Sequence, residues 1–79
     1  MSEWRDERVL VTGGASFIGS HLVEDLVELG ARVRVADDFS SGTQSNLAGV
    51  ADRIEILDGN LKDTAFADRA TDGMDTVFH

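Results

Sequence analysis

Residues 9–19, with the sequence VLVTGGASFIG, constrain the fold of this chain more than any other feature. The stretch begins with an apolar, β-branched run ending at Thr12, which is typical of a strand buried on both faces of a parallel sheet. Glycines follow at once, and an amphipathic segment begins near Phe17. The order strand, glycine turn, helix therefore predicts that the chain opens with the first half of a βαβ unit.

The segment after the glycine turn has helical periodicity. Ile18, Leu22, Leu26 and Leu29 recur at spacings that place them on one face of a helix, which we expect to face the core. Gly30 follows directly and fits a left-handed helix stop.

Strands and helices continue to alternate to the end of the chain. We expect strands at residues 31–36, 53–57 and 75–79, a weakly periodic short helix within 43–50, and a second helix at 62–71. In the strand at 31–36, Val33 and Val35 are expected on one face, and Arg32 and Arg34 on the other. Asp63 or Thr64 is the candidate cap of that second helix. Residues 1–8 form a polar lead-in, and residues 9–79 are expected to form one α/β domain with a parallel sheet and right-handed crossovers.

The bulk composition excludes several classes of protein. The chain has 79 residues and no cysteine, so neither a disulfide framework nor a cysteine zinc site supports the fold. Its formal net charge is −8, which disfavours nucleic acid and anionic membrane as partners. The N-terminus lacks an apolar signal core, so we expect a cytoplasmic protein.

The glycine turn has the spacing of a phosphate-binding loop. In a dinucleotide fold, three glycines at G-x-x-G-x-x-G or related spacings permit a tight turn, close backbone approach to a pyrophosphate and close packing of the helix. Gly13 and Gly19 occupy the first and third positions here, and Ser16 occupies the second. The Ser16 side chain crowds the phosphate path, although its hydroxyl is able to donate to a phosphate oxygen. We therefore expect weaker binding than a full glycine set would give.

Asp37 is the expected acidic partner of this turn. It follows the second strand, 18 residues after Gly19, near the distance expected for a carboxylate that accepts hydrogen bonds from an adenine ribose. Its charge repels a 2′-phosphate, so NAD is favoured over NADP. The alternative is that Asp37 and Asp38 are a solvated pair that caps the next turn.

With these residues placed, the chain resembles the extended short-chain dehydrogenase/reductase family, and within it the NAD-dependent nucleotide-sugar epimerases and dehydratases. The resemblance is carried by four motifs in order: residues 11–22 (VTGGASFIGSHL), 35–42 (VADDFSSG), 58–63 (DGNLKD) and 75–79 (DTVFH). It implies the N-terminal half of a Rossmann-type parallel sheet with strand order 3-2-1-4 and flanking helices.

The resemblance also implies roles for matching positions. Phe17 and Ile18 would present backbone to the pyrophosphate, and Asp37 would hold the adenosine ribose. Asn60 and Leu61 would meet the adenine edge, with Asn60 standing where the family usually has Asp. The segment expected to line the adenosine side is Asp38, Phe39, Ser40, Ser41 and Gly42.

The chain lacks the family's catalytic pair. The resemblance implies a Tyr-x-x-x-Lys motif, but the sequence has no tyrosine, and Lys62, in the third cofactor segment, is its only lysine. We therefore expect no catalytic residue here. Three hypotheses follow: a module that binds the adenosine-diphosphate half of NAD, a fragment of an active epimerase or dehydratase completed by missing sequence or another chain, and a self-associating scaffold with a vestigial motif.

The fourth strand carries two further expectations. In the family's strand order it lies at an open edge of the sheet, where Val77 and Phe78 would be poorly covered, so we expect a homo-oligomer formed through this edge. His79 would end this strand near the cofactor. A Ser–His–Asp arrangement of Ser40 or Ser41 with His79 and Asp37 needs support from geometry.

Overall fold

The computed structural model of the chain describes residues 4–40 and 42–79. The elements are β1 (Arg8–Thr12), α1 (Phe17–Glu28), β2 (Arg32–Asp37), the short 3-10 helices η1 (Gln44–Leu47) and η2 (Ala51–Arg53), β3 (Ile54–Asp58), α2 (Thr64–Thr71) and β4 (Thr76–Phe78). The α/β alternation is confirmed. The helix expected within residues 43–50 is instead a single 3-10 turn, in keeping with its weak periodicity.

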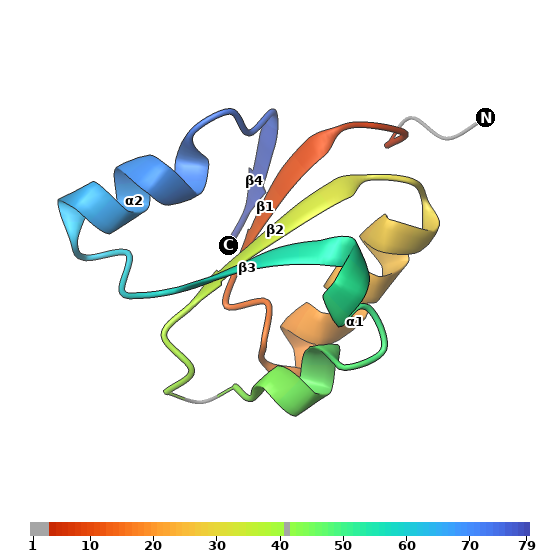
Figure 1. Ribbon diagram of the computed structural model, residues 1–79, viewed down its shortest axis with the longest axis horizontal. Helices are drawn as coiled ribbons and strands as arrows, with labels where there is room; N and C mark the ends of the chain where they lie inside the picture. Colours follow the sequence, from red (N-terminus) through yellow and green to blue (C-terminus); the bar gives the residue numbers. More distant parts are fainter. Residues whose placement is uncertain (1–3, 41) are drawn as a thin grey trace.

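The four strands form one parallel sheet in the predicted order β3-β2-β1-β4 (Figure 1). Val9 pairs with Val33 on one side and with Thr76 on the other, and Val33 pairs in turn with Ile54. The helices cover opposite faces of the sheet, α1 with η1 and η2 on one and α2 on the other (Figure 1).

Residues along each strand alternate between the two faces. Val9 and Val11 pack into the larger core against α1, whereas Leu10 packs into the smaller core under α2. On β2 the same alternation buries Val33 and Val35 toward α1, as predicted from the sequence. The face toward α2 is held by only a few buried apolar side chains: Leu10, Ala36, Phe66 and Ala70.

The buried face of α1 differs from the predicted stripe. Ile18 is 83% exposed and Leu29 is 44% exposed, so the ends of that stripe lie outside the core. The side chains that α1 buries are Ser20, Val23, Leu26 and Val27. Periodicity identified the helix correctly, but both faces carry apolar residues, and packing against the sheet selected the one with Val23 and Val27.

Gly30 ends this helical unit as predicted. Its φ of +90° lies in the left-handed region that favours glycine. Asp63 caps α2, because its side chain accepts hydrogen bonds from the backbone N–H groups of Ala65 and Phe66. Of the two candidate caps, the structure therefore selects Asp63 rather than Thr64.

β4 is the short edge strand beside β1. Val77 is 39% exposed, as expected, but Phe78 is only partly exposed because the Trp4 ring contacts it, with centroids 5.8 Å apart. The carboxylate of Asp75 accepts a hydrogen bond from the backbone N–H of Arg8 at 2.9 Å and joins the start of β4 to β1.

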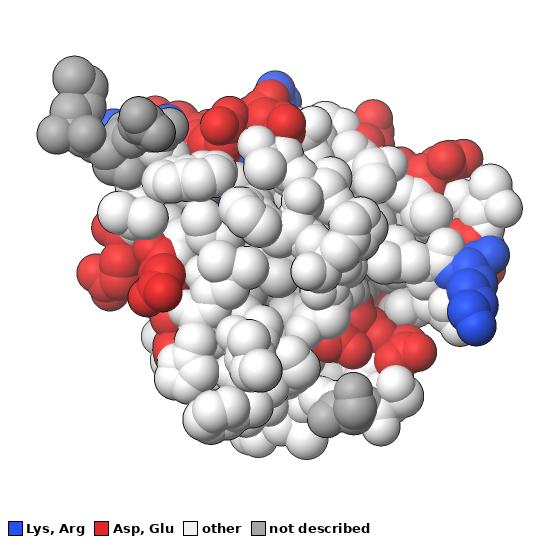
Figure 2. All heavy atoms as spheres, turned by 180° about the vertical axis from the view of Figure 1, so that it is seen from behind, with Lys and Arg blue, Asp and Glu red and all other residues white. Residues whose placement is uncertain are grey.

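Within residues 4–40 and 42–79, no helix has the length and hydropathy needed to cross a membrane. Acidic side chains lie in several separate groups around the face shown in Figure 2.

Candidate functional site

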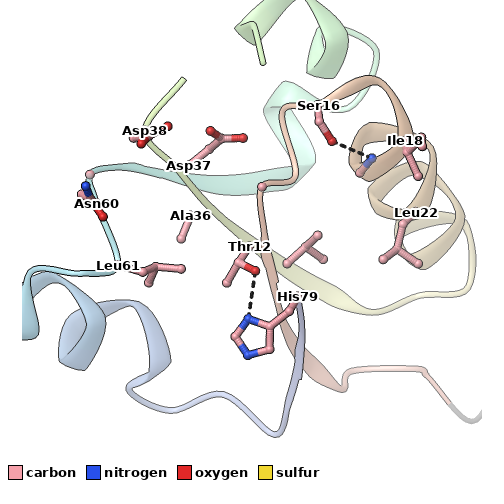
Figure 3. Close-up of a pocket in the computed structure, with 14 residues that line it drawn as sticks. Thr12, Ser16, Ile18, Leu22, Ala36, Asp37, Asp38, Asn60, Leu61 and His79 are labelled. Carbon is pink, nitrogen blue, oxygen red and sulfur yellow. Dashed lines mark hydrogen bonds between the residues drawn. The ribbon is translucent and has the colours of Figure 1, made fainter. Parts of the chain in front are cut away.

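A cavity of about 520 Å³ opens where β1, β2 and β4 end and α1 begins (Figure 3). In open parallel sheets this carboxyl edge, at the point where the strand order reverses, is where ligands bind. β1 lies between β2 and β4, so the order reverses at this cavity. The lining residues are Val11, Thr12, Gly13, Ser16, Ile18, Gly19, Leu22, Ala36, Asp37, Asp38, Gly59, Asn60, Leu61 and His79.

Local geometry requires two glycines here, Gly13 in the turn between β1 and α1 and Gly19 in the first turn of α1. Gly13 has φ +68°, which other residues adopt only with strain. A Cβ on Gly19 would lie 2.4 Å from the carbonyl oxygen of Gly13, far inside van der Waals contact. The turn is therefore so compact that backbone alone separates the end of β1 from α1.

Ser16 is the N-cap of α1. Its φ of −69° and ψ of 164° are extended, so the serine causes no left-handed strain in the turn. Its Oγ accepts a hydrogen bond from the backbone N–H of Gly19 at 3.0 Å (Figure 3). The hydroxyl proton remains available to a ligand, but one donor of the helix N-terminus is already used.

The first turn of α1 still offers unpaired donors. Within the described part of the chain, the backbone N–H groups of Phe17 and Ile18 have no acceptor. Such N–H groups, together with the partial positive charge of a helix N-terminus, form a site for an anion. A site of this kind is made by the backbone alone, which suits a chain with a net charge of −8.

Asp37 ends β2 beside the glycine turn. Its Oδ2 accepts from the backbone N–H of Ala15 at 3.0 Å, and its Oδ1 accepts from that of Phe39 at 2.8 Å. The carboxylate therefore joins two backbone segments before any ligand is present. Each carboxylate oxygen has a further lone pair, so acceptance from ribose hydroxyls stays compatible with these contacts.

A second segment holds the glycine turn from outside. The carbonyl oxygen of Ala15 accepts from the Asn46 side-chain amide at 2.8 Å and from the Thr43 backbone N–H at 3.2 Å. A Cβ on Gly42 would lie 2.5 Å from the carbonyl carbon of Ala15, so this glycine packs against the turn. Sequence reasoning missed Asn46, since neither motif nor periodicity singles it out.

Asp38 and Phe39 shape the loop after β2. Phe39 has φ +59°, an uncommon conformation for a residue other than glycine. Asp38 accepts from the backbone N–H of Ser40 at 3.0 Å, and this hydrogen bond lowers the pKa of the Asp38 carboxyl below its usual value. Asp37 accepts from the Phe39 N–H and Asp38 accepts from the Ser40 N–H. These two hydrogen bonds fit the alternative interpretation of the sequence, in which Asp37 and Asp38 cap the turn after β2.

The predicted site residues fall into three groups. Eight line the one cavity: Gly13, Ser16, Ile18, Gly19, Asp37, Asp38, Asn60 and Leu61. Four do not line it: Phe17 begins α1, and Phe39, Ser40 and Gly42 lie in the loop after β2. Ser41 lies outside the described residues.

The adenine-side loop, residues 60–61, which the family resemblance expects to meet the adenine, follows β3. The side-chain oxygen of Asn60 accepts from the backbone N–H of Lys62 at 2.9 Å, which leaves one lone pair on that oxygen. Leu61 lies on the opposite side of the cavity from Ile18 and Leu22 of α1 (Figure 3). The cavity thus has apolar side chains on both sides and polar groups along the strand ends.

His79 lines the cavity but does not form a triad. Its Nδ1 lies 3.2 Å from the Thr12 hydroxyl, which donates to the carbonyl oxygen of Phe78 at 3.1 Å (Figure 3). Among the hydrogen bonds of the described residues, none joins His79 to Asp37, whose oxygens accept from backbone N–H groups instead. The imagined Ser–His–Asp arrangement therefore has no geometric support.

The parallel sheet with strand order β3-β2-β1-β4, together with a cavity at the carboxyl edge where this order reverses, identifies a Rossmann-type fold. The family model described as "NAD dependent epimerase/dehydratase family" matches residues 9–79, and the chain belongs to this family.

Relatives and solved structures agree with this assignment. A 3β-hydroxysteroid dehydrogenase/Δ5→4-isomerase of Mycobacterium tuberculosis is 42% identical over 72 residues, covering 91% of this chain and 18% of the relative. A UDP-N-acetyl-α-D-glucosaminuronate decarboxylase of Bacillus cytotoxicus is 37% identical over 73 residues, covering 92% of this chain and 23% of the relative. The chain thus spans about a fifth of the length of these curated relatives.

Two solved structures superimpose closely. The epimerase Mth375 of Methanothermobacter thermautotrophicus matches with a TM-score of 0.89 and 35% identity, over 96% of this chain and 23% of that one. The enzyme WbmF of Bordetella bronchiseptica, solved in complex with NAD+, matches with a TM-score of 0.86 and 34% identity, over 99% of this chain and 24% of that one. The names of the matched proteins include both steroid and sugar-nucleotide enzymes, so they point to a shared fold rather than to one substrate.

Proposed function

We propose that this chain binds NAD through its adenosine-diphosphate half, in the cavity between the glycine turn and residues 60–61. The observation that carries the proposal is that Asp37 and Ile18 line the same cavity, and that the backbone N–H groups of Ile18 and of its neighbour Phe17 have no acceptor among the described residues. These two N–H groups suit a pyrophosphate, and the Asp37 carboxylate suits ribose hydroxyls. The NAD complex of the similar WbmF supports this choice of ligand.

The residues fit the cofactor in shape as well as charge. Gly13 and Gly19 leave no side chain where backbone must approach a phosphate, and a cavity of about 520 Å³ is within the usual range for a small-molecule site. Asn60 and Leu61 would border the adenine. When bound, NAD supplies hydride acceptance and donation. The described residues bind and orient its adenosine end, and we assign no catalytic group among them.

Titration calorimetry with NAD, ADP and NADP tests the proposal. Binding of NAD and ADP with similar affinity, and weaker binding of NADP, is the expected result, because the contacts are to the shared adenosine diphosphate and Asp37 repels a 2′-phosphate. Binding of none of the three would favour the scaffold hypothesis. Turnover of a sugar nucleotide by this chain would contradict the assignment of no catalytic residue.

We also propose that the folded chain self-associates through β4. This strand has β1 on one side and, in the described part of the chain, no strand on the other, and Val77 is 39% exposed there. An unpaired strand edge is a template for pairing with another chain. Sedimentation should therefore show dimers or larger species at micromolar concentration, and a folded monomer would contradict this proposal.

A further inference from the structure

Arg34 lies under α2, on the opposite face of the sheet from α1. On β2 it pairs in register with Leu10 of β1 and with Glu55 of β3. Its side chain is only 17% exposed, far less than that of Arg32 two residues earlier, which is 73% exposed. An arginine held this closely in a face otherwise occupied by Leu10 and Ala36 needs specific partners.

The partners of Arg34 are the end of α2 and Glu55. Its Nη1 donates to the carbonyl oxygens of Arg69 at 3.0 Å, Ala70 at 3.0 Å and Asp72 at 2.9 Å. Its Nε donates to a Glu55 carboxylate oxygen at 2.6 Å. The last carbonyls of a helix lack intrahelical donors and carry partial negative charge, so a cation there satisfies and stabilises them.

α2 has few other attachments to the sheet. It is eight residues long and buries only Phe66 and Ala70. Helices of this length are not stable alone, so α2 depends on its docking contacts. Phe66 packs closely on Gly59: a Cβ added to Gly59 would lie 2.4 Å from the nearest atom of the Phe66 ring.

The start of α2 is continuous with the adenine-side loop. The backbone N–H of Asp63, the N-cap of α2, donates to the carbonyl oxygen of Asn60 at 2.9 Å. The backbone N–H of Lys62 donates to the Asn60 side-chain oxygen, also at 2.9 Å. The backbone conformation and the side chain of Asn60 are therefore set by the chain that leads into α2.

We propose that Arg34 is a positioning residue for adenine recognition: by holding the C-terminal carbonyls of α2 against β2, it keeps Asn60 and Leu61 in place at the cavity. The inference rests on the proposed nucleotide site and adds a determinant that never touches the ligand. When α2 undocks, only the fraction of molecules with the loop in place binds adenine well, and the apparent affinity falls by that fraction.

The test compares two nucleoside diphosphates that differ only at the base. ADP carries the 6-amino group that the Asn60 oxygen would accept from, and inosine diphosphate has a carbonyl there. Titration calorimetry measures the ratio of the two affinities in the wild type, in R34M, which removes the donors, and in R34K, which keeps a cationic donor. R32M is the matched control, because Arg32 lies on the same strand and face and pairs with Asp6 at 3.7 Å. Among the described residues, no hydrogen bond or ion pair joins its side chain to α2.

We expect the wild type to prefer ADP and R34M to bind ADP about tenfold more weakly with the ratio near one, a tenfold loss being about 1.4 kcal/mol. R34K should recover most of the ratio and R32M should retain it. A merely structural loss would lower both affinities equally and leave the ratio unchanged, which would overturn the inference. Wild-type chain that binds neither diphosphate would instead overturn the proposed site itself.

Hydrogen exchange provides a measurement without ligand. The amides of α2 should exchange faster in R34M than in R32M when each is compared with the amides of α1, because local undocking exposes them. Equal protection of α2 in the two variants would contradict the inference. If R34M does not fold, R34K carries both measurements, with the same expected recovery of the ratio and with α2 protection close to that of R32M.

Discussion

The Asp37 carboxylate accepts a hydrogen bond from the backbone N–H of Ala15 at 3.0 Å, across a sequence separation of 22 residues. This contact joins the end of β2 to the turn between β1 and α1. The residue expected to recognise the ribose thus also braces the turn expected to receive the pyrophosphate. The two halves of the proposed site are therefore coupled before a ligand binds.

Replacing Asp37 should change cofactor preference. Asp37→Asn removes the charge that repels a 2′-phosphate, so the preference for NAD over NADP should fall by about tenfold, or about 1.4 kcal/mol. Titration calorimetry with both cofactors measures this. Asp25→Asn is the control, because Asp25 is an exposed carboxylate on α1 that does not line the cavity. An unchanged preference in Asp37→Asn would show that this carboxylate does not face the ribose.

Replacing Ser16 with glycine should lower the stability of the fold slightly but raise its affinity for NAD. Ser16→Ala removes the N-cap oxygen and should lower the free energy of unfolding by about 1 kcal/mol, whereas Ser16→Gly should cost only a few tenths of a kcal/mol. Ser16→Gly should also bind NAD more tightly, because the Gly19 N–H is released to a phosphate oxygen. Urea unfolding and calorimetry measure the two effects. Weaker NAD binding by Ser16→Gly would indicate that the serine hydroxyl itself contacts the phosphate.

Gly19 should not tolerate a side chain. A Cβ there would lie 2.4 Å from the Gly13 carbonyl oxygen, so Gly19→Ala must displace the turn and should destabilise the fold by about 1–3 kcal/mol. Gly49→Ala is the control, since its Cβ would meet only a Glu24 carboxylate oxygen at 3.8 Å. Urea unfolding of both variants checks the difference. Equal stability of the two would refute the described packing of the turn.

Asp75 should make the fold sensitive to acid. The Arg8 backbone N–H, followed by the Arg8 side chain, lowers the pKa of the Asp75 carboxyl in the folded state. The stabilisation is therefore complete above the unfolded-state pKa and is lost as pH falls through the lowered folded-state value, in the range below about pH 4. Urea unfolding as a function of pH should show a shallower acid limb for Asp75→Asn.

A control separates this effect from general acid denaturation. Asp52→Asn also removes one carboxylate, but the side chain of Asp52 makes no hydrogen bond or ion pair with the described residues. Its acid limb should keep the shape of the wild type. An acid limb of Asp75→Asn that coincides with that of Asp52→Asn would mean that the contact with Arg8 does not contribute to stability.

Much of the fold follows from local sequence. The apolar run before Thr12, the helix stop at Gly30 and the Val33–Val35 alternation each depend on neighbours in the chain, and each prediction is confirmed. The strand order was expected from the family resemblance and is also confirmed. The prediction of which face of α1 is buried was wrong, because Ile18 and Leu29 are exposed. α1 has two apolar faces, and only packing against the sheet decides which of them is buried.

The candidate site divides in the same way. Glycine spacing and the carboxylate after β2 are visible as motifs, because they report on backbone conformation and charge at fixed distances along the chain. The Asn46 amide on Ala15 and the Arg34 guanidinium on the end of α2 join segments 31 to 38 residues apart and leave no periodic signal.

For residues 9–19, the sequence alone was sufficient to predict a strand, a tight turn and a helix that suits a phosphate. Only the assembled sheet shows that Asp37 braces this turn and that Arg34 holds the opposite helix. Local conformation depends on nearby residues and is readable from them, whereas these hydrogen bonds exist because the parallel sheet and its crossover helices bring together residues that are far apart in the sequence.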